Sequence, residues 1–302
     1  MKKLIAILAA LAIVLTLAAC GAKTNDETTT TEPEVTEEIT EEVVTDEVTE
    51  APTDADESTE APEESTEAPD ESKEDASETE SETEEATEAP KAPQTKEEIV
   101  AYFNEASNKI KTDAKSVTRN SSKISLAGST QLPGWVNTVA RVVGGADAFI
   151  DDQLTKNSKG SETFTGAQIK ATYPVEGESY ASKLTAADVK SATCTEKDGK
   201  YTITIVTVAD ATSQNAAHGQ GHAPKAFNVP LPATINENVP GFAKNMIGGT
   251  AAMEYPSSTF KIVVDAKTGH VESANSDLYW TIHFGTDTTL PFRTQDSWTI
   301  KY

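Results

Sequence analysis

The chain has 302 residues, with 49 acidic and 25 basic side chains and a formal net charge of −24. The charge is unevenly distributed, because Gly21–Ala92 holds 28 acidic residues and three lysines, which leaves residues 93–302 nearly neutral. A neutral domain without clustered Lys and Arg gives no reason to expect nucleic acid as a partner. The two cysteines, Cys20 and Cys194, do not form a disulfide framework of the kind that holds small secreted domains together.

The first 21 residues, MKKLIAILAALAIVLTLAACG, have the pattern of a secretory signal peptide: two lysines, an apolar run and small residues. The small residues before Cys20 resemble the lipobox of bacterial lipoproteins. This resemblance implies cleavage after Ala19, a diacylglyceryl group on the Cys20 thiol, and a lipid-anchored protein at the outer surface of the cell membrane. An uncleaved membrane helix is the alternative, and it would tether the protein by the chain itself.

The following segment is acidic and repetitive. It contains four copies of Thr-Glu-Ala-Pro, and no aromatic residue occurs in Thr24–Pro90. Such a segment buries too little apolar surface to fold, so we expect an extended, disordered linker that lifts a domain away from the membrane. Weak calcium binding or an adhesive charged brush are alternative roles. We therefore predict a signal peptide at 1–19, a linker at 20–92 and a single domain at 93–302, which is long enough to bury a core.

The domain opens with helical patterns. Thr95 and Glu98 form a capping box, and apolar residues then recur at three- and four-residue steps, which predicts an amphipathic helix to about Ala114. An extended segment is expected over Lys115–Gly128. A second helical pattern runs from Pro133 to Ile150, where two adjacent glycines favour a break.

Strands dominate the rest of the domain. Asp198-Gly199 between two alternating runs predicts a hairpin, and Asp265–Gly269 predicts a second one that ends at Val271. Two further alternating runs surround Trp280 and Trp298. We expect an α+β fold, in which the N-terminal helices pack on one face of a curved antiparallel sheet. The stretch 209–258 reads as irregular, with a short helix expected within 240–252.

Few residues suggest chemistry. His218 and His222 are the only pair with metal-ligand spacing, but two intervening glycines and the lack of a nearby acid favour a surface loop without metal. We expect His270 and His283 to be exposed, and Cys194 to be a buried, inert thiol. The common hydrolase and nucleotide-binding motifs are absent from the sequence, so we predict neither an enzyme nor a cofactor, although paired carboxylates of a hydrolase leave no motif.

Large aromatic residues are predicted to point inward. Trp135, Trp280, Trp298 and Phe284 either fill the core or line an apolar cavity between the helices and the sheet.

Two segments carry a resemblance to known proteins. Thr95–Arg119 (TKEEIVAYFNEASNKIKTDAKSVTR) and Ile262–Ser273 (IVVDAKTGHVES), together with the lipobox and the linker, resemble uncharacterised surface lipoproteins of Gram-positive, clostridia-like bacteria. The expected architecture also resembles the lipoprotein-carrier half-barrels of the LolA and LppX type, whose cavity holds acyl chains. Likeness of fold does not establish function, and no binding residue is transferred.

Three functions follow as hypotheses. The first is non-catalytic binding of an apolar ligand, such as a lipid, or of a cell-envelope component. The second is an adhesion or scaffold module that acts through the outer sheet face and the 209–258 stretch. The third is a hydrolase of wall or other polymers, which requires two carboxylates facing each other across a cleft.

Overall fold

The structure is a computed structural model, and it describes residues 91–302 with the exception of 142–143, 240, 242–243 and 245–246. The predicted signal peptide, the predicted lipidation site Cys20 and residues 20–90 of the predicted linker lie outside the described residues. In the part of the chain that is described, no helix is both long enough and apolar enough to span a membrane.

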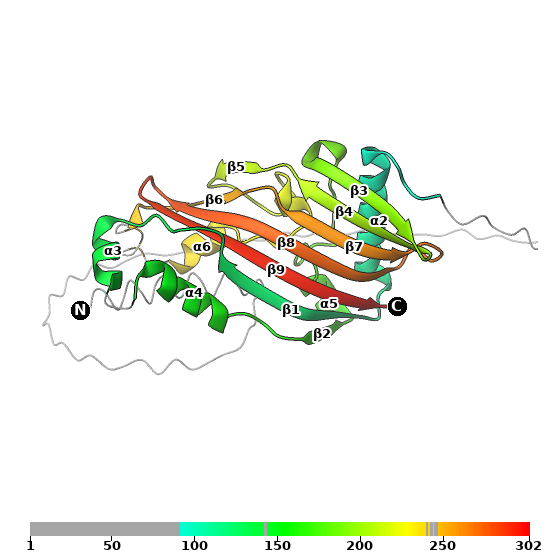
Figure 1. Cartoon of the computed structure of the whole chain (residues 1–302), viewed down its shortest axis with the longest axis horizontal. Coiled ribbons are helices and arrows are strands. Elements are labelled where there is room, and N and C mark those ends of the chain that lie inside the picture. Colours follow the sequence, from blue (N-terminus) through cyan, green and yellow to red (C-terminus); the bar gives the residue numbers. More distant parts are fainter. Residues whose placement is uncertain (1–90, 142–143, 240, 242–243, 245–246) are drawn as a thin grey trace, which may run out of the picture. The chain divides into compact units, whose positions relative to one another are not determined.

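A nine-stranded antiparallel sheet forms the centre of the described domain (Figure 1). Its strands are β1 (Ser116–Leu126), β2 (Glu162–Thr165), β3 (Val189–Lys197), β4 (Lys200–Thr207), β5 (Asp210–Ser213), β6 (Ala251–Tyr255), β7 (Thr259–Asp265), β8 (Val271–Phe284) and β9 (Thr288–Lys301). Seven strands follow the order β2-β1-β9-β8-β7-β4-β3, while β6 pairs with the far end of β8 and β5 pairs with β6. The predicted α+β class with an antiparallel sheet is confirmed.

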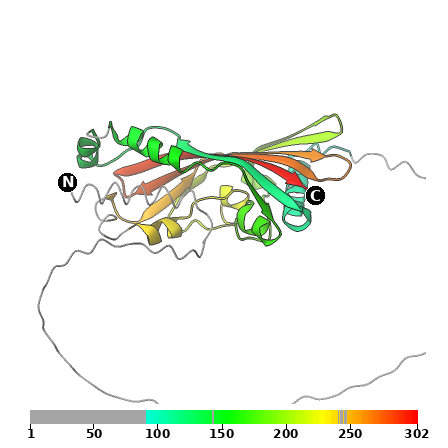
Figure 2. The same ribbon diagram turned by 90° about the horizontal axis from the view of Figure 1, so that it is seen from below.

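The helices are short except for the first. They are α2 (Lys96–Asp113), α3 (Gly134–Ala140), α4 (Ala146–Lys156), α5 (Ala167–Thr172) and α6 (Pro232–Asn238), with two 3-10 turns, η2 (Ala186–Asp188) and η3 (Ala223–Lys225). Figure 2 shows α2, α5 and α6 on the same side of the sheet. We call this covered side the inner face, and the opposite side the outer face.

Local sequence patterns place the first helix and both hairpins correctly. Thr95 caps α2 through the predicted capping box with Glu98. Asp198 and Gly199 have φ angles of 52° and 72°, the left-handed values that a two-residue hairpin turn requires. In the second hairpin, the carboxylate of Asp265 accepts hydrogen bonds from the backbone N–H groups of Lys267 and Thr268.

The second helical pattern matches the prediction in its break but not in its position. It splits into α3 and α4 at the two glycines, as their low helix propensity favours. The prediction placed this segment over the inner face, but α4 lies alongside β1 and packs against it (Figure 1). The inner face is covered instead by α2, α5 and α6 (Figure 2).

The stretch 209–258 is more regular than predicted. It contains β5, η3, α6 and β6, and β6 extends the sheet along the distal half of β8. The helix expected within 240–252 falls partly on residues outside the described set, but Gly241, Lys244 and Ile247 are helical as predicted. From Ala251 onward the chain is a strand. The sequence pattern failed here because Gly, Asn and Pro separate short elements that only tertiary pairing stabilises.

The core lies between the sheet and its inner cover. Phe103 of α2 packs edge-to-face on Phe260 of β7, with ring centroids 5.5 Å apart. From Ala274 of β8 onward and along β9 the even-numbered side chains point inward, among them Trp280 and Trp298, while the odd-numbered ones point to the outer face. Before Ala274 a register shift in the pairing with β7 places Val271 in the core. One face of the sheet is therefore packed, and the other is available to solvent or to a partner.

Candidate functional site

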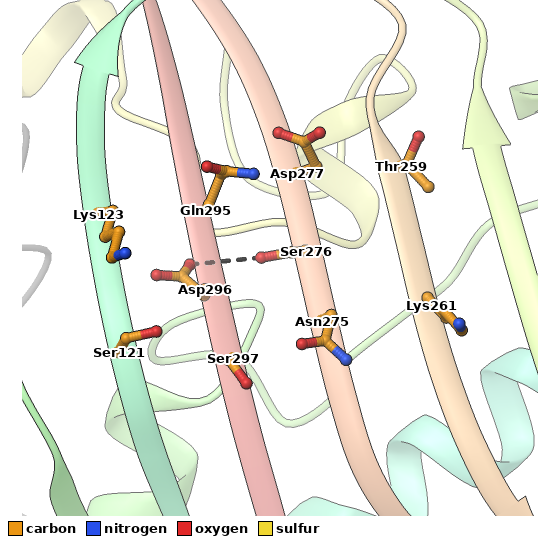
Figure 3. Close-up of a pocket in the computed structure, with 10 residues that line it drawn as sticks. All are labelled: Ser121, Lys123, Thr259, Lys261, Asn275, Ser276, Asp277, Gln295, Asp296 and Ser297. Carbon is orange, nitrogen blue, oxygen red and sulfur yellow. Dashed lines mark hydrogen bonds between the residues drawn. The ribbon is translucent and has the colours of Figure 1, made fainter.

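A pocket of about 310 Å³ lies on the outer face, over the centre of the sheet (Figure 3). Four adjacent strands form it, namely β1, β9, β8 and β7, and every side chain that lines it is polar or charged. The lining residues are Ser121, Lys123, Thr259, Lys261, Asn275, Ser276, Asp277, Gln295, Asp296 and Ser297.

Strand register arranges eight of these residues in two rows that cross the strands. The first row is Lys123–Gln295–Asp277–Thr259, and the second is Ser121–Ser297–Asn275–Lys261. Directly paired residues of an antiparallel sheet present their side chains on the same face, about 5 Å from one another. We call this set of eight residues the polar grid. It offers hydroxyl, amide, ammonium and carboxylate groups on a single surface.

An ion pair borders the polar grid on one side. Arg293 donates from Nε and an Nη nitrogen to the two carboxylate oxygens of Asp277, at 2.6 and 2.7 Å. The guanidinium of Arg293 also lies over the ring of Tyr279, 5.4 Å from its centroid. This bidentate contact fixes the orientation of the Asp277 carboxylate and neutralises its charge.

Two pocket residues belong to the floor. Ser276 and Asp296 alternate with the grid residues along β8 and β9, so their side chains are directed to the inner face. The hydroxyl of Ser276 donates to Asp296 over 3.4 Å (Figure 3). Burial raises the pKa of the Asp296 carboxyl. The hydrogen bonds from Ser122 and Ser276 and the charge of Arg119 only partly oppose the rise.

A second carboxyl with a raised pKa lies in the inner layer. Burial raises the pKa of Glu176 to about 7, the charges of Lys159 and Arg119 oppose the rise, and the charge of Asp296 adds to it. Glu176 Oε1 accepts a hydrogen bond of 3.0 Å from the amide of Asn228. Glu176 and Asp296 are thus two interacting carboxyls with raised pKa values, but they belong to the inner layer and not to the polar grid.

The structure separates the aromatic residues that were predicted to act together. Trp280, Trp298 and Phe284 are buried, as predicted. The indole of Trp280 donates to Thr294 and packs on Phe292 with ring centroids 4.3 Å apart, while Trp298 packs edge-to-face on Tyr173. These contacts are those of core packing, and their role as a ligand cavity stays a prediction.

The prediction for Trp135 is wrong. Its side chain is 38% exposed, whereas Val136 and Ala140, four residues apart on α3, are buried. Because α3 ends before the glycines, its buried face is narrow and includes Val136 and Ala140, and Trp135 lies outside that face. A sequence pattern extended across two separate helices assigned the residue to the wrong face.

The two histidines with metal-ligand spacing lie in a loop. His222 Nδ1 is 2.8 Å from Asp188 Oδ1, and Lys225 Nζ is 2.7 Å from the same oxygen. His218 is half-buried, and its Nδ1 has no hydrogen-bond partner among the described residues. The described residues contain no group of three or more His, Cys, Asp or Glu side chains arranged to hold a metal ion.

Asp188 is the centre of the cluster that includes His222. It is 3% exposed, and its second oxygen, Oδ2, accepts from the backbone N–H of Thr185 at 2.7 Å and from the Thr185 hydroxyl at 2.8 Å. Burial alone would raise the pKa of Asp188, but the hydrogen bonds from Lys225, Thr185 and His222 outweigh it and lower the pKa to about 2. Asp188 is therefore a buried anion that joins η2 to η3.

The glycines between the histidines have a structural reason. A Cβ on Gly221, whose φ is +72°, would come within 2.6 Å of Asp210 Oδ1. That carboxylate accepts hydrogen bonds of 2.7 and 2.9 Å from the backbone N–H groups of His222 and Ala223. The motif thus lies in a loop, as predicted, and its glycine allows the close approach of two chain segments that Asp210 holds together.

The other singled-out residues also have defined surroundings. His270 stacks on Tyr302 with ring centroids 3.8 Å apart, and His283 Nε2 lies 3.0 Å from Glu254. Both residues are half-buried and not exposed as predicted. Cys194 is half-buried, and burial raises the pKa of its thiol.

Sequence reasoning missed the polar grid itself. Its members occupy alternate, polar positions of predicted strands, such as Asn275 and Gln295, and nothing local distinguishes them from ordinary solvent-facing residues. Only the register of four strands brings them together. Comparisons of the chain with models of protein families, with curated proteins and with solved structures gave no match.

Proposed function

We propose that this protein is a lipid-anchored, extracytoplasmic lipoprotein whose domain binds a hydroxyl-rich component of the cell envelope without catalysis. One observation carries the proposal: the pocket of the polar grid lies on the outer face, and every residue that lines it is polar or charged. Side-chain amides, hydroxyls and charges that converge on a surface are the groups that hydrogen-bond polyhydroxylated ligands. The apolar-ligand version is less favoured, because Trp135 is on the surface and the other tryptophans are packed.

The shape of the surface favours an elongated ligand. Each row of the polar grid extends over four strands. Three spacings of about 4.8 Å between neighbouring strands make a row roughly 14 Å long. An extended polymer lying across the strands would contact successive grid residues with successive hydroxyl groups. The adhesion hypothesis would use the same face, but it predicts a protein as the ligand.

The lipid anchor is a proposal with a direct test. If Cys20 is the first residue of the mature chain, the protein purified from a bacterial membrane begins at Cys20 and carries the added mass of a diacylglyceryl group. Mass spectrometry of the intact protein and of its N-terminal peptide measures both quantities. A chain that still carries residues 1–19 without lipid would contradict lipidation and favour the uncleaved helix.

Binding through the polar grid is tested by removing its amides. The double variant Asn275→Ala and Gln295→Ala is expected to bind isolated cell-wall sacculi about thirtyfold more weakly than the unaltered protein, since the two lost hydrogen bonds contribute about 1 kcal/mol each. A co-sedimentation isotherm measures the affinity. The matched control is Thr193→Ala with Thr195→Ala, two exposed β3 residues outside the pocket.

The control variant should retain full affinity. Equal binding by the grid variant and the control would remove the polar grid from the function, and absence of binding by the unaltered protein would remove the envelope polymer as its ligand.

A further inference from the structure

Two lysines determine the charge of the polar grid. Lys123 ends the first row on β1 and Lys261 ends the second row on β7, so they occupy diagonally opposite corners. Both side chains are exposed. Within the described part of the chain, neither ammonium group has a hydrogen bond or an ion pair.

The carboxylates near these lysines are already engaged. The Asp277 carboxylate accepts hydrogen bonds from two nitrogens of Arg293, Nε and an Nη, and the Asp296 side chain is directed to the inner face. Among the outward-facing side chains, the charges of Arg293 and Asp277 cancel, which leaves the positive charges of the two lysines. The surface of the polar grid therefore has an excess of two positive charges on a domain whose overall charge is close to zero.

The positions of the lysines suit an extended chain with repeated charges. Three strand spacings of about 4.8 Å and an offset of two residues along a strand separate their Cα atoms by roughly 16 Å. A compact ligand that fills one end of the polar grid would meet only one ammonium group. A linear polymer across all four strands would meet both, with the amides of Asn275 and Gln295 between them.

We propose that the polar grid selects polyanions: linear polymers that bear hydroxyl groups together with phosphate or carboxylate groups, with Lys123 and Lys261 each binding one negative charge. The inference rests on the proposed function and adds the charge of the polymer to it. Since both lysines are exposed, the electrostatic attraction is screened by salt, and the affinity must fall as ionic strength rises.

The test compares three polymers immobilised on a sensor: polyglycerol phosphate, polygalacturonate and neutral dextran. The full-length protein is used in mild detergent. We expect at least one of the polyanions to bind more tightly than dextran, and its affinity to fall about tenfold between 50 and 500 mM NaCl. Tighter binding of one polyanion identifies the phosphate or the carboxylate as the preferred anion.

The double variant Lys123→Met and Lys261→Met should bind the preferred polyanion at least tenfold more weakly, with no change toward dextran. Lys197→Met with Lys267→Met is the matched control, because these exposed lysines lie at hairpin ends outside the pocket, and it should bind like the unaltered protein. Circular dichroism checks that both variants are folded.

The outcomes separate the two proposals. Two results would overturn the selection of polyanions and leave the binding of hydroxyl-rich polymers standing. The first is equal binding of all three polymers that does not change with salt. The second is an unchanged affinity of the Lys123→Met and Lys261→Met variant for the polyanion. Absence of binding to all three polymers, together with absence of binding to sacculi, would overturn both.

Discussion

Replacing Asp188 with Asn is expected to lower the free energy of unfolding by about 3 kcal/mol, because it breaks a buried charge pair. The Asp188 carboxylate accepts four hydrogen bonds, two from Thr185 and one each from His222 and Lys225. An amide at this position has only one acceptor oxygen, and its NH₂ group would face a donor. Lys225, whose side chain is 22% exposed, would lose its counter-ion. Denaturant unfolding monitored by tryptophan fluorescence measures the change.

The pH dependence of this effect has a defined sign. The pKa of Asp188 is about 2 in the folded protein, below its ordinary value of 3.8, so the ionised carboxylate stabilises the fold above about pH 4. That contribution is lost as the pH falls from about 4 toward 2, and the difference between the unaltered protein and Asp188→Asn should shrink in the same range.

Asp198→Asn is the matched control for Asp188→Asn. Asp198 is exposed in a hairpin turn with φ of 52°, a conformation that Asn adopts readily, so we expect a change below about 0.5 kcal/mol. If Asp188→Asn were as stable as this control, the buried anion would have no part in stability.

Glu176→Gln is expected to act in the opposite direction and to stabilise the domain by about 2 kcal/mol at pH 8. The pKa of Glu176 is about 7 in the folded protein, against an ordinary value of 4.5, chiefly because the carboxyl is buried. The protonated form is therefore the favoured form in the fold. Stability should decline as the pH rises from about 4.5 to 7, since the carboxyl must then ionise inside the protein.

Glutamine removes that ionisation and keeps an oxygen that accepts the hydrogen bond from Asn228. The gain in free energy of unfolding should therefore be large at pH 8 and small at pH 5, as measured by urea titrations at the two pH values. Glu237→Gln, on the exposed surface of α6, serves as the matched control. A gain from Glu176→Gln that is equal at both pH values would show that ionisation of Glu176 is not its cause.

The parts of the fold that sequence could predict are those with local causes. The capping box at Thr95, the left-handed turn at Asp198-Gly199 and the Asp265 loop each depend on residues within a few positions of one another. Their physical reasons, namely satisfied backbone groups and tolerated φ angles, are visible in a short window. The alternation of buried and exposed residues along β4 and β8 is local in the same sense.

The candidate site could not be predicted, because its causes are distant in the sequence. Lys123 and Gln295 become neighbours only through the pairing of β1 with β9. Likewise, the spacing of His218 and His222 suggested at most a weak metal site, while the partner that explains His222 is Asp188, on another segment. The exposed Trp135 was misplaced for a related reason: a period of 3.6 residues does not indicate where one helix ends and the next begins.

The pairing of β9 between β1 and β8 has a consequence for how the chain is made. The last strand of the domain lies in the middle of the sheet, and Asn120 hydrogen-bonds to Thr299 across 179 positions of sequence. The centre of the sheet cannot close until residue 301 has left the ribosome. Pairings of such long range also form slowly. Until β9 has emerged, the part of the sheet that holds β2 and β1 and the part that holds β8 and its other neighbours lack the strand that joins them.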